Sequence, residues 1–141
     1  MTFLNFLAKF RRISFRRVIF LILSSILSIY VYILMKFFRR KSHFVSSNTK
    51  EFKVSELSLL QDIQWTVKNV SRIIPWEFVC RHQAYLATIF CRVLNIKYKI
   101  VVGTKVNREK QIVEGHVWTI ADGVFLSGAC NVNEYTVIQT L

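Results

Sequence analysis

The stretch PWEFVCRHQA, residues 75–84, decides how this chain divides into elements. Before it, apolar side chains recur at steps of three and four, which predicts an amphipathic helix that ends near residue 74. Pro75 stops that helix because it lacks a backbone N–H and disfavours helical geometry in the residue before it. Proline also favours helix starts, so we expect a second helix to begin at residues 75–76, with Cys80 in its first turn. The apolar stripe of the first helix consists of Leu60, Ile63, Val67, Val70 and Ile74.

A cysteine in the first turn of a helix differs from an ordinary core cysteine. Unpaired N–H groups and the helix dipole favour the thiolate of Cys80 there, whereas burial in the core is the usual role of cysteine and is expected for Cys91 and Cys130. The three cysteines include no CxxC pair, so we expect no disulfide framework, no metal site and no cofactor. Two interpretations of Cys80 remain, a core residue and a nucleophile.

After the second helix the sequence turns β-rich. One run covers residues 98–102 and is closed by Gly103, and a second covers residues 113–121. Asp122 and Gly123 then separate the second run from a short third one, which predicts a two-residue hairpin turn. The whole pattern predicts an α+β domain, a helix pair with a small antiparallel sheet.

The chain has three histidines, and only one of them can face Cys80. His43 falls in a polar linker, and His82 lies about 200° round the helix from the cysteine. His116 lies within the second β-rich run, on a rigid element. A cysteine at a helix start and a histidine on a strand are the arrangement of papain-like and transglutaminase-like nucleophiles, in which imidazole accepts the thiol proton and later protonates the leaving amine.

A third group could orient the imidazole. With a two-residue turn, Ala129 would lie opposite His116, and Asn131 would lie diagonally on the histidine's face, where its amide could bond the ring. The other interpretation of Asn131 is a loop residue at a strand end. Asp122 is not the orienting group, because the strand places it roughly 20 Å from His116 and the hairpin turn already explains it.

The basic charge is concentrated before this domain. The 141-residue chain has a net charge of +12, and residues 1–41 carry nine Lys or Arg and no acid. Residues 18–35 are uncharged and just long enough to span a bilayer, but they carry a polar stripe of serines that favours packing on protein. Basic residues that flank an apolar run favour membrane lipid over nucleic acid as a partner.

These observations predict three segments. Residues 1–41 form a basic, hydrophobic helical segment, which associates with a membrane or packs on a partner, residues 42–53 form a linker, and residues 54–141 form the folded domain. We expect the protein at the cytoplasmic side of the cell membrane, or in the cytoplasm as part of a complex.

The same residues resemble the leader peptidases of lasso-peptide biosynthesis, which are transglutaminase-like cysteine proteases. The resemblance covers about residues 5–140, and it implies a papain/transglutaminase-like core preceded by a basic hydrophobic helix. It also implies removal of the leader from a ribosomally made precursor, with Cys80 as nucleophile and His116 as general base and acid. The matching positions are Pro75, Trp76, Cys80, Gln83, Ala84, Leu94, Ile96, Gly103, His116, Trp118, Asp122 and Gly123.

The resemblance implies partners as well. Small stand-alone members resemble one half of a split protein, so a separate leader-recognition protein would present the lasso precursor peptide, and a cyclase resembling asparagine synthetase would close the product. One position departs from the family, because Gly128 stands where the family has the acid that follows its histidine. Two alternatives stay open, a non-catalytic membrane-tethered scaffold subunit and an enzyme that transfers the acyl group to an amine.

Overall fold

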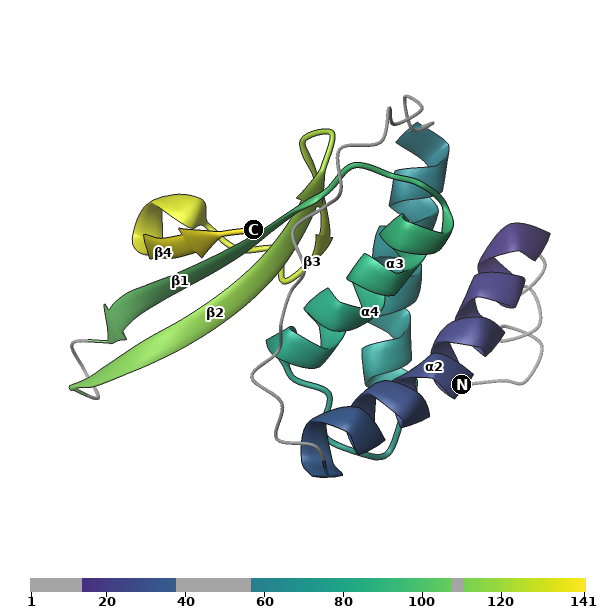
Figure 1. Ribbon diagram of the computed structural model, residues 1–141, viewed down its shortest axis with the longest axis horizontal. Helices are drawn as coiled ribbons and strands as arrows, with labels where there is room; N and C mark the ends of the chain where they lie inside the picture. The colour runs from purple at the N-terminus through teal and green to yellow at the C-terminus, as the bar shows by residue number, and fades with distance from the viewer. Residues whose placement is uncertain (1–13, 38–56, 108–110) are drawn as a thin grey trace, which may run out of the picture.

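The computed structural model describes residues 14–37, 57–107 and 111–141, which form helices packed on one side of a four-stranded sheet (Figure 1). The strand order is β3-β2-β1-β4, and every neighbouring pair is antiparallel. The predicted α+β class is confirmed. In chain order the elements are α2 (Phe15–Phe37), α3 (Leu57–Ile73), α4 (Cys80–Val93), β1 (Lys99–Asn107), β2 (Ile112–Ala121), β3 (Val124–Ser127), a 3₁₀ turn (Val132–Glu134) and β4 (Thr136–Thr140).

The apolar helix α2 lies along the domain. Near its start, Arg16 and Arg17 both pair with the buried carboxylate of Asp62 on α3. Near its end, the Tyr32 ring lies 6.1 Å from the Trp76 ring, centroid to centroid. Two of the serines predicted to form a polar stripe, Ser24 and Ser28, are buried on this inner face together with Val31. The predicted linker, residues 42–53, lies outside the described residues.

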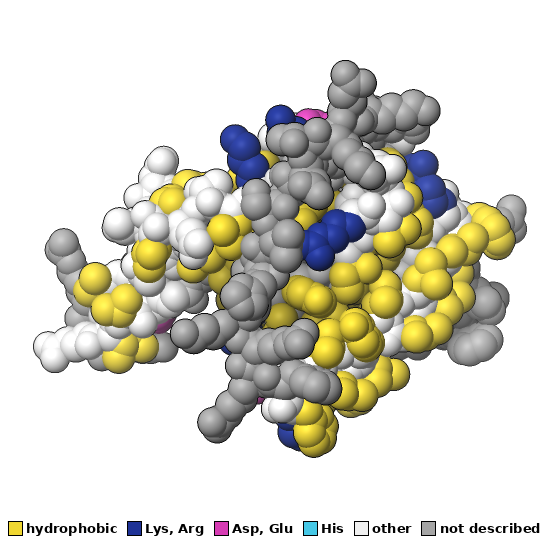
Figure 2. Space-filling view, viewed as in Figure 1, with side chains coloured by type: hydrophobic (Ala, Val, Ile, Leu, Met, Phe, Trp, Pro, Cys, Tyr) yellow, Lys and Arg dark blue, Asp and Glu magenta, His cyan; other side chains and the backbone are white. Residues whose placement is uncertain are grey.

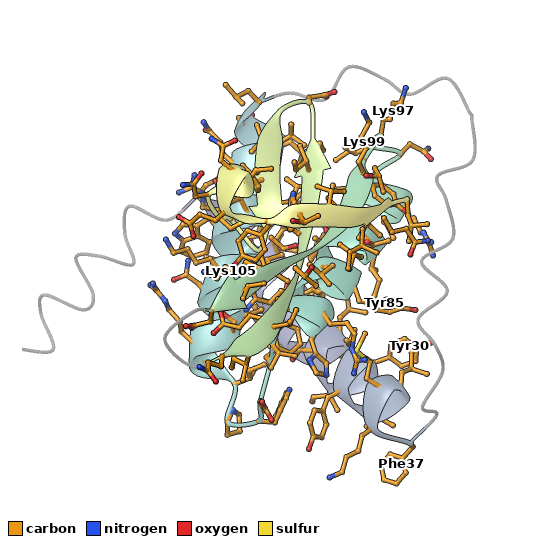
Figure 3. All side chains as sticks on the ribbon, turned by 90° about the vertical axis from the view of Figure 1, so that its left-hand side faces the viewer. Tyr30, Phe37, Tyr85, Lys97, Lys99 and Lys105 are labelled. Carbon is orange, nitrogen blue, oxygen red and sulfur yellow. The ribbon has the colours of Figure 1, made fainter. Side chains whose placement is uncertain are left out.

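The outer face of α2 is apolar and exposed. Figure 2 shows apolar side chains gathered over this helix on the right of the view, and in Figure 3 Tyr30 and Phe37 project away from the domain. By length and composition α2 could cross a membrane. Its contacts with α3 and with Trp76 instead hold both ends of the helix against the domain. The exposed large apolar residues of α2 are Phe15, Ile19, Ile22, Leu23, Ile26, Ile29, Tyr30, Ile33 and Phe37.

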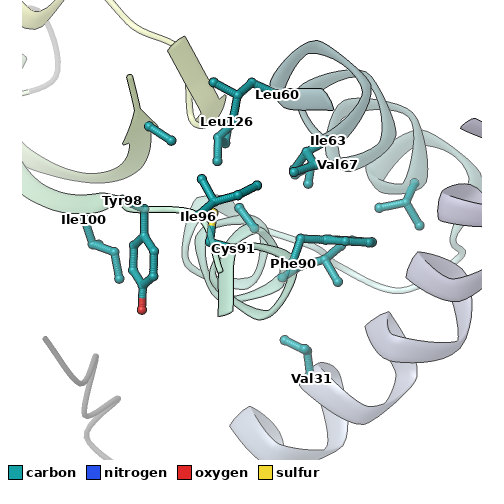
Figure 4. Packing of buried hydrophobic residues seen from close by; sticks show 14 of the residues in the cluster. Val31, Leu60, Ile63, Val67, Phe90, Cys91, Ile96, Tyr98, Ile100 and Leu126 are labelled. Atoms are coloured by element: carbon teal, nitrogen blue, oxygen red, sulfur yellow. The ribbon is translucent and has the colours of Figure 1, made fainter. Parts of the chain in front are cut away.

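The core lies between the helices and the sheet (Figure 4). Four members of the predicted stripe on α3 are buried, and the helix ends at Ile73, as Pro75 requires. Helix α4 adds Phe90, whose ring lies 5.2 Å from that of Phe20 on α2. Cys91 is fully buried in the same cluster, so its predicted core role agrees with its position. The core role predicted for Cys130 is wrong, because Cys130 follows the turn at Gly128 and is only half-buried outside the cluster.

The second helix begins later than predicted. Residues 75–79 are not helical, and α4 starts at Cys80 rather than at residues 75–76. The reason is tertiary packing, because Phe78 is buried in the core and Val79 is extended, with φ −74° and ψ 172°. Burial of a large aromatic side chain outweighs the modest preference of proline for a helix start. Cys80 therefore becomes the first helical residue.

Strand β1 continues through Gly103, where the sequence predicted its end. Gly103 pairs with His116 of β2, and a Cβ atom at this glycine would lie 2.8 Å from the Trp118 ring. The glycine therefore makes room for a buried tryptophan on the neighbouring strand rather than ending β1. The predicted hairpin turn is confirmed, since Asp122 and Gly123 have φ values of +45° and +78°.

The pairing of β2 with β3 differs from the prediction. The register shifts between Thr119 and Ile120, and β3 ends at Ser127. Gly128 then turns the chain with φ +62°. The predicted pairing of Ala129 with His116 is therefore wrong, because a bulge breaks the regular ladder before those residues are reached.

Candidate active site

Cys80 is half-buried at the N-terminus of α4, with Val79 as the N-cap residue. The Val79 side chain makes no capping hydrogen bond, and its carbonyl accepts from the N–H groups of His82 and Gln83 at 2.9 and 3.1 Å. The first N–H groups of a helix have no partner within the helix, so those of Cys80 and Arg81 remain available to an anion. The thiol thus stands at the positive end of the helix dipole.

The other two thiols are poorer nucleophiles. Burial raises the pKa of the Cys91 thiol to about 12. Burial and the nearby Glu134 carboxylate also raise the pKa of Cys130. All three cysteines are free. Because the thiolate is the reactive form, the raised pKa values disfavour Cys91 and Cys130 as nucleophiles, and the position at a helix start favours Cys80.

His116 lies in the middle of β2 and has one ring nitrogen fixed by the backbone. Its Nε2 atom is 2.8 Å from the carbonyl oxygen of Gly128. A carbonyl oxygen can only accept a hydrogen bond, so Nε2 must carry the hydrogen. The neutral imidazole then has its lone pair on Nδ1, which leaves that atom as the proton acceptor.

Gly128 is a glycine for a physical reason. Its φ of +62° is the left-handed region, and a Cβ atom at this position would lie 2.4 Å from the Val117 carbonyl oxygen. The tight turn brings the Gly128 carbonyl to the imidazole. The backbone thus supplies an acceptor at the position where the resemblance implies an acid.

Two aromatic rings form a cluster with the imidazole. The Trp118 ring lies 5.9 Å from that of His116, centroid to centroid, with 28° between the planes. The Tyr135 ring lies 5.4 Å from the histidine ring. Tyr135 follows the 3₁₀ turn, and nothing in the sequence pattern linked it to the histidine. Together the carbonyl and the two rings restrict the orientation of His116.

Asn131 does not orient the histidine in this structure. Its Oδ1 atom accepts from the Asn133 N–H at 3.4 Å, and its Nδ2 atom donates to Glu134 Oε1 at 3.1 Å. Both polar atoms therefore bond within the 3₁₀ turn that Asn131 caps. The interpretation as a loop residue describes Asn131, because the bulge in β3 removed the register that would have placed it beside His116.

The elements that carry Cys80 and His116 are neighbours. Helix α4 packs against β2, and Figure 1 shows its N-terminal end directed toward that strand. Within the described residues no hydrogen bond joins the Cys80 thiol to a nitrogen of His116. Catalytic hydrogen bonds often form only when substrate is bound, and the packing of α4 on β2 brings the two elements of a cysteine–histidine pair together.

His82 does not belong to this candidate site. His82 is 9% exposed, and its ring lies 5.4 Å from that of Phe78 and 6.4 Å from that of Tyr32. Burial and the nearby Arg81 lower the pKa of His82, an effect that Glu77 partly opposes. His43 lies outside the described residues.

Residues 28–140 match the profile of the transglutaminase-like superfamily. The chain belongs to this superfamily. No curated protein and no solved structure matches it significantly. The transglutaminase-like superfamily includes cysteine proteases and acyltransferases. Its match covers Cys80, His116 and Gly128, together with the second half of α2.

Proposed function

We propose that this transglutaminase-like protein is a cysteine peptidase, with Cys80 as nucleophile and His116 as general base and then general acid. The observation that carries the proposal is the bond between His116 Nε2 and the Gly128 carbonyl. It leaves Nδ1 as the one basic nitrogen of a ring whose direction is restricted by its neighbours. A fixed base and a thiol at a helix start are what nucleophilic acyl transfer needs.

The reaction follows from these groups. His116 Nδ1 accepts the thiol proton, and the Cys80 sulfur attacks the carbonyl carbon of the scissile peptide bond. The N–H groups at the start of α4 can stabilise the negative oxygen that develops there. The C–N bond then breaks, Nδ1–H protonates the leaving amine, and a thioester remains on Cys80. Water, deprotonated by Nδ1, hydrolyses the thioester and restores the thiol.

For the substrate we propose the leader of a ribosomally made lasso-peptide precursor. The support is the resemblance in residues 75–84 and in the segment around His116. A separate leader-recognition protein would present the precursor, and an asparagine-synthetase-like cyclase would act on the freed peptide. The small size of the domain supports the first partner, because a helix pair and a short sheet offer little surface for reading a long leader.

We also propose that the outer face of α2 lies on membrane lipid at the cytoplasmic side. The support is the apolar stripe of exposed residues along the whole helix (Figure 2). Flotation with anionic vesicles tests this. The triple variant Ile22→Ser/Ile26→Ser/Ile29→Ser should be released from vesicles. The triple variant Val106→Ser/Val113→Ser/Ile138→Ser, which changes sheet residues that are at least as exposed, should stay bound. Equal flotation of both triple variants would show that α2 is not the surface that binds the membrane.

The peptidase proposal is tested by mass spectrometry of a precursor peptide incubated with the full chain and a leader-recognition protein. Cys80→Ala should abolish cleavage, whereas Cys130→Ala, which removes another half-buried thiol, should retain it. Cleavage that survives in the Cys80→Ala chain would contradict the assignment. An added amine that appears in the product mass would identify an acyl transferase instead, and a chain that leaves the peptide unchanged under all conditions would favour a scaffold subunit.

A further inference from the structure

A groove of about 730 Å³ runs between α3 and β3. This volume is in the range of ligand-binding clefts. One wall is a single face of α3, and the other is the end of β3 with the turn that follows it. The lining residues that matter for its chemistry are Arg17, Lys68, Arg72, Gln83, Ser127 and Gly128.

The charge of this groove is entirely of one sign. Its lining includes three basic side chains and no acidic one. Arg17 is already paired with Asp62 and lies 5.5 Å from the centre of the Trp65 ring. Lys68 and Arg72 are exposed, lie one turn apart on α3, and have no carboxylate partner among the described residues. Two cations are thus available to a ligand.

A buried hydroxyl on β3 points to a ligand independently of the charge. Ser127 lines the groove and is 6% exposed, yet its Oγ atom has no hydrogen-bond partner within the described residues. A buried hydroxyl without a partner is costly, and rotation of the Ser127 side chain toward the groove would let a ligand bond the hydroxyl and recover that free energy. Hydroxyl and amide donors beside two unpaired cations suit a carboxylate ligand.

The groove reaches the neighbourhood of the proposed catalytic pair without including it. Gly128 lines the groove and holds His116 with its carbonyl. Gln83 also lines it and lies in the first turn of α4, which begins at Cys80. A peptide that occupies the groove would therefore lead toward both groups.

We propose that this groove binds an acidic stretch of a peptide, with its carboxylates at Lys68 and Arg72. The inference deepens the proposed function and rests on it for the link to cleavage, whereas binding itself needs no catalysis. An acidic peptide is favoured over a single small anion because a groove of about 730 Å³, lined also by apolar side chains such as Trp65 and Phe125, has room for the residues that carry the carboxylates. The groove thus sets a sequence preference on one side of the cleaved bond.

The experiment measures binding to the full-length Cys80→Ala chain in non-ionic detergent at low salt, by fluorescence anisotropy. The probes are three labelled peptides that differ only in having Glu, Gln or Lys at the same positions. The Glu peptide should bind about tenfold more tightly than the Gln peptide. In the Lys68→Glu/Arg72→Glu chain its affinity should fall about tenfold, and the Lys peptide should become the preferred ligand.

The matched control is Lys97→Glu/Lys99→Glu. These exposed lysines project outward at the start of β1 (Figure 3), do not line the groove, and change the net charge by the same amount. Equal losses in the two double variants would overturn the proposal in favour of a long-range charge effect. Equal binding of the Glu and Gln peptides would overturn it directly. A short single-stranded RNA that binds at Lys68 and Arg72 more tightly than the Glu peptide would assign the groove to nucleic acid.

The groove and the peptidase activity can fail separately. Selective binding of the Glu peptide by a chain that cleaves no precursor supports the groove and contradicts the peptidase. Cleavage of precursor by a chain that binds the Glu and Gln peptides equally supports the peptidase and overturns the acidic preference.

Discussion

Two histidines of this protein both contact aromatic rings, but they differ in whether a ring nitrogen is held by a hydrogen bond. His116 contacts the rings of Trp118 and Tyr135, which also contact each other, and its Nε2 atom bonds the Gly128 carbonyl. His82 also contacts two rings, those of Tyr32 and Phe78, but its buried Nδ1 atom has no partner among the described residues. Burial alone keeps an imidazole neutral without fixing which nitrogen is basic. A directed hydrogen bond fixes it, and this separates a candidate base from a packing residue.

The largest difference between the two sites should appear in reactivity. His116→Gln should reduce precursor cleavage by about a thousandfold or more, because the general base and acid is lost. It should also slow alkylation of Cys80 by iodoacetamide near neutral pH. His82→Gln is the matched variant and should change both rates less than about threefold, since His82 is buried on the α2 side of α4. Equal losses in the two variants would show that His116 is no more important for catalysis than His82.

Gly128→Ala tests the carbonyl that anchors His116. The added methyl group meets the Val117 carbonyl oxygen and the positive φ is strained, so unfolding should become easier by about 2–4 kcal/mol. In the folded fraction kcat should fall more than KM rises, and the pH profile of Cys80 alkylation should shift.

Gly115→Ala is the control for this prediction. Gly115 lies on β2 beside His116, and a Cβ atom there meets nothing within 4 Å, so stability should change by about 0.5 kcal/mol or less. A folded Gly128→Ala chain with unchanged kcat and an unchanged alkylation profile would show that the carbonyl does not position the base.

The unpaired histidine should make stability depend on pH. The pKa of His82 is lowered from 6.5, so the folded protein binds this proton less readily than the unfolded chain does. Stability should therefore be complete above pH 6.5 and fall as the pH drops through the lowered pKa. Replacement with leucine should reduce this acid loss in thermal melts. A Cys80→Ala chain keeps the histidine and serves as the control, and an identical acid loss in the His82→Leu chain would exclude His82 as its source.

The smallest effect is expected at Asn131. Its side chain bonds only within the 3₁₀ turn, so Asn131→Ala should cost about 0.5–1 kcal/mol of stability and leave cleavage within about twofold of the native rate. Chemical denaturation and precursor cleavage measure the two quantities. A loss of kcat comparable to that in His116→Gln would return Asn131 to the role of orienting group.

The sequence predicted those parts of the molecule that depend on local pattern. The apolar stripe of α3 and the turn at Asp122 and Gly123 have short-range causes, and both are as predicted. The predicted start of α4 was wrong because the helix begins where the burial of Phe78 in the core allows, and that burial depends on long-range contacts. The predicted pairing of β2 with β3 was wrong because the bulge cannot be recognised from the alternation of apolar and polar residues in the sequence.

The candidate site was predictable only as far as side chains carry its chemistry. Cys80 and His116 were identified because thiol and imidazole are recognisable residue types. The group that bonds His116 is a backbone carbonyl, which every residue has, so no residue type announces it. The one available signal was a glycine after a short strand, where a positive φ is affordable only without a Cβ atom.

The attachment of α2 to the domain at both ends restricts how the domain can be oriented. Arg16 and Arg17 bind one end of this helix to Asp62, and Tyr32 packs on Trp76 near the other end. Helix α2 is therefore fixed to the domain at both ends and does not act as a flexible link. A domain mounted in this way on a lipid surface would keep one orientation toward the bilayer and could not rotate freely above it. A peptide would then reach the groove between α3 and β3 from a fixed height and direction, and its search would become a two-dimensional one along the membrane.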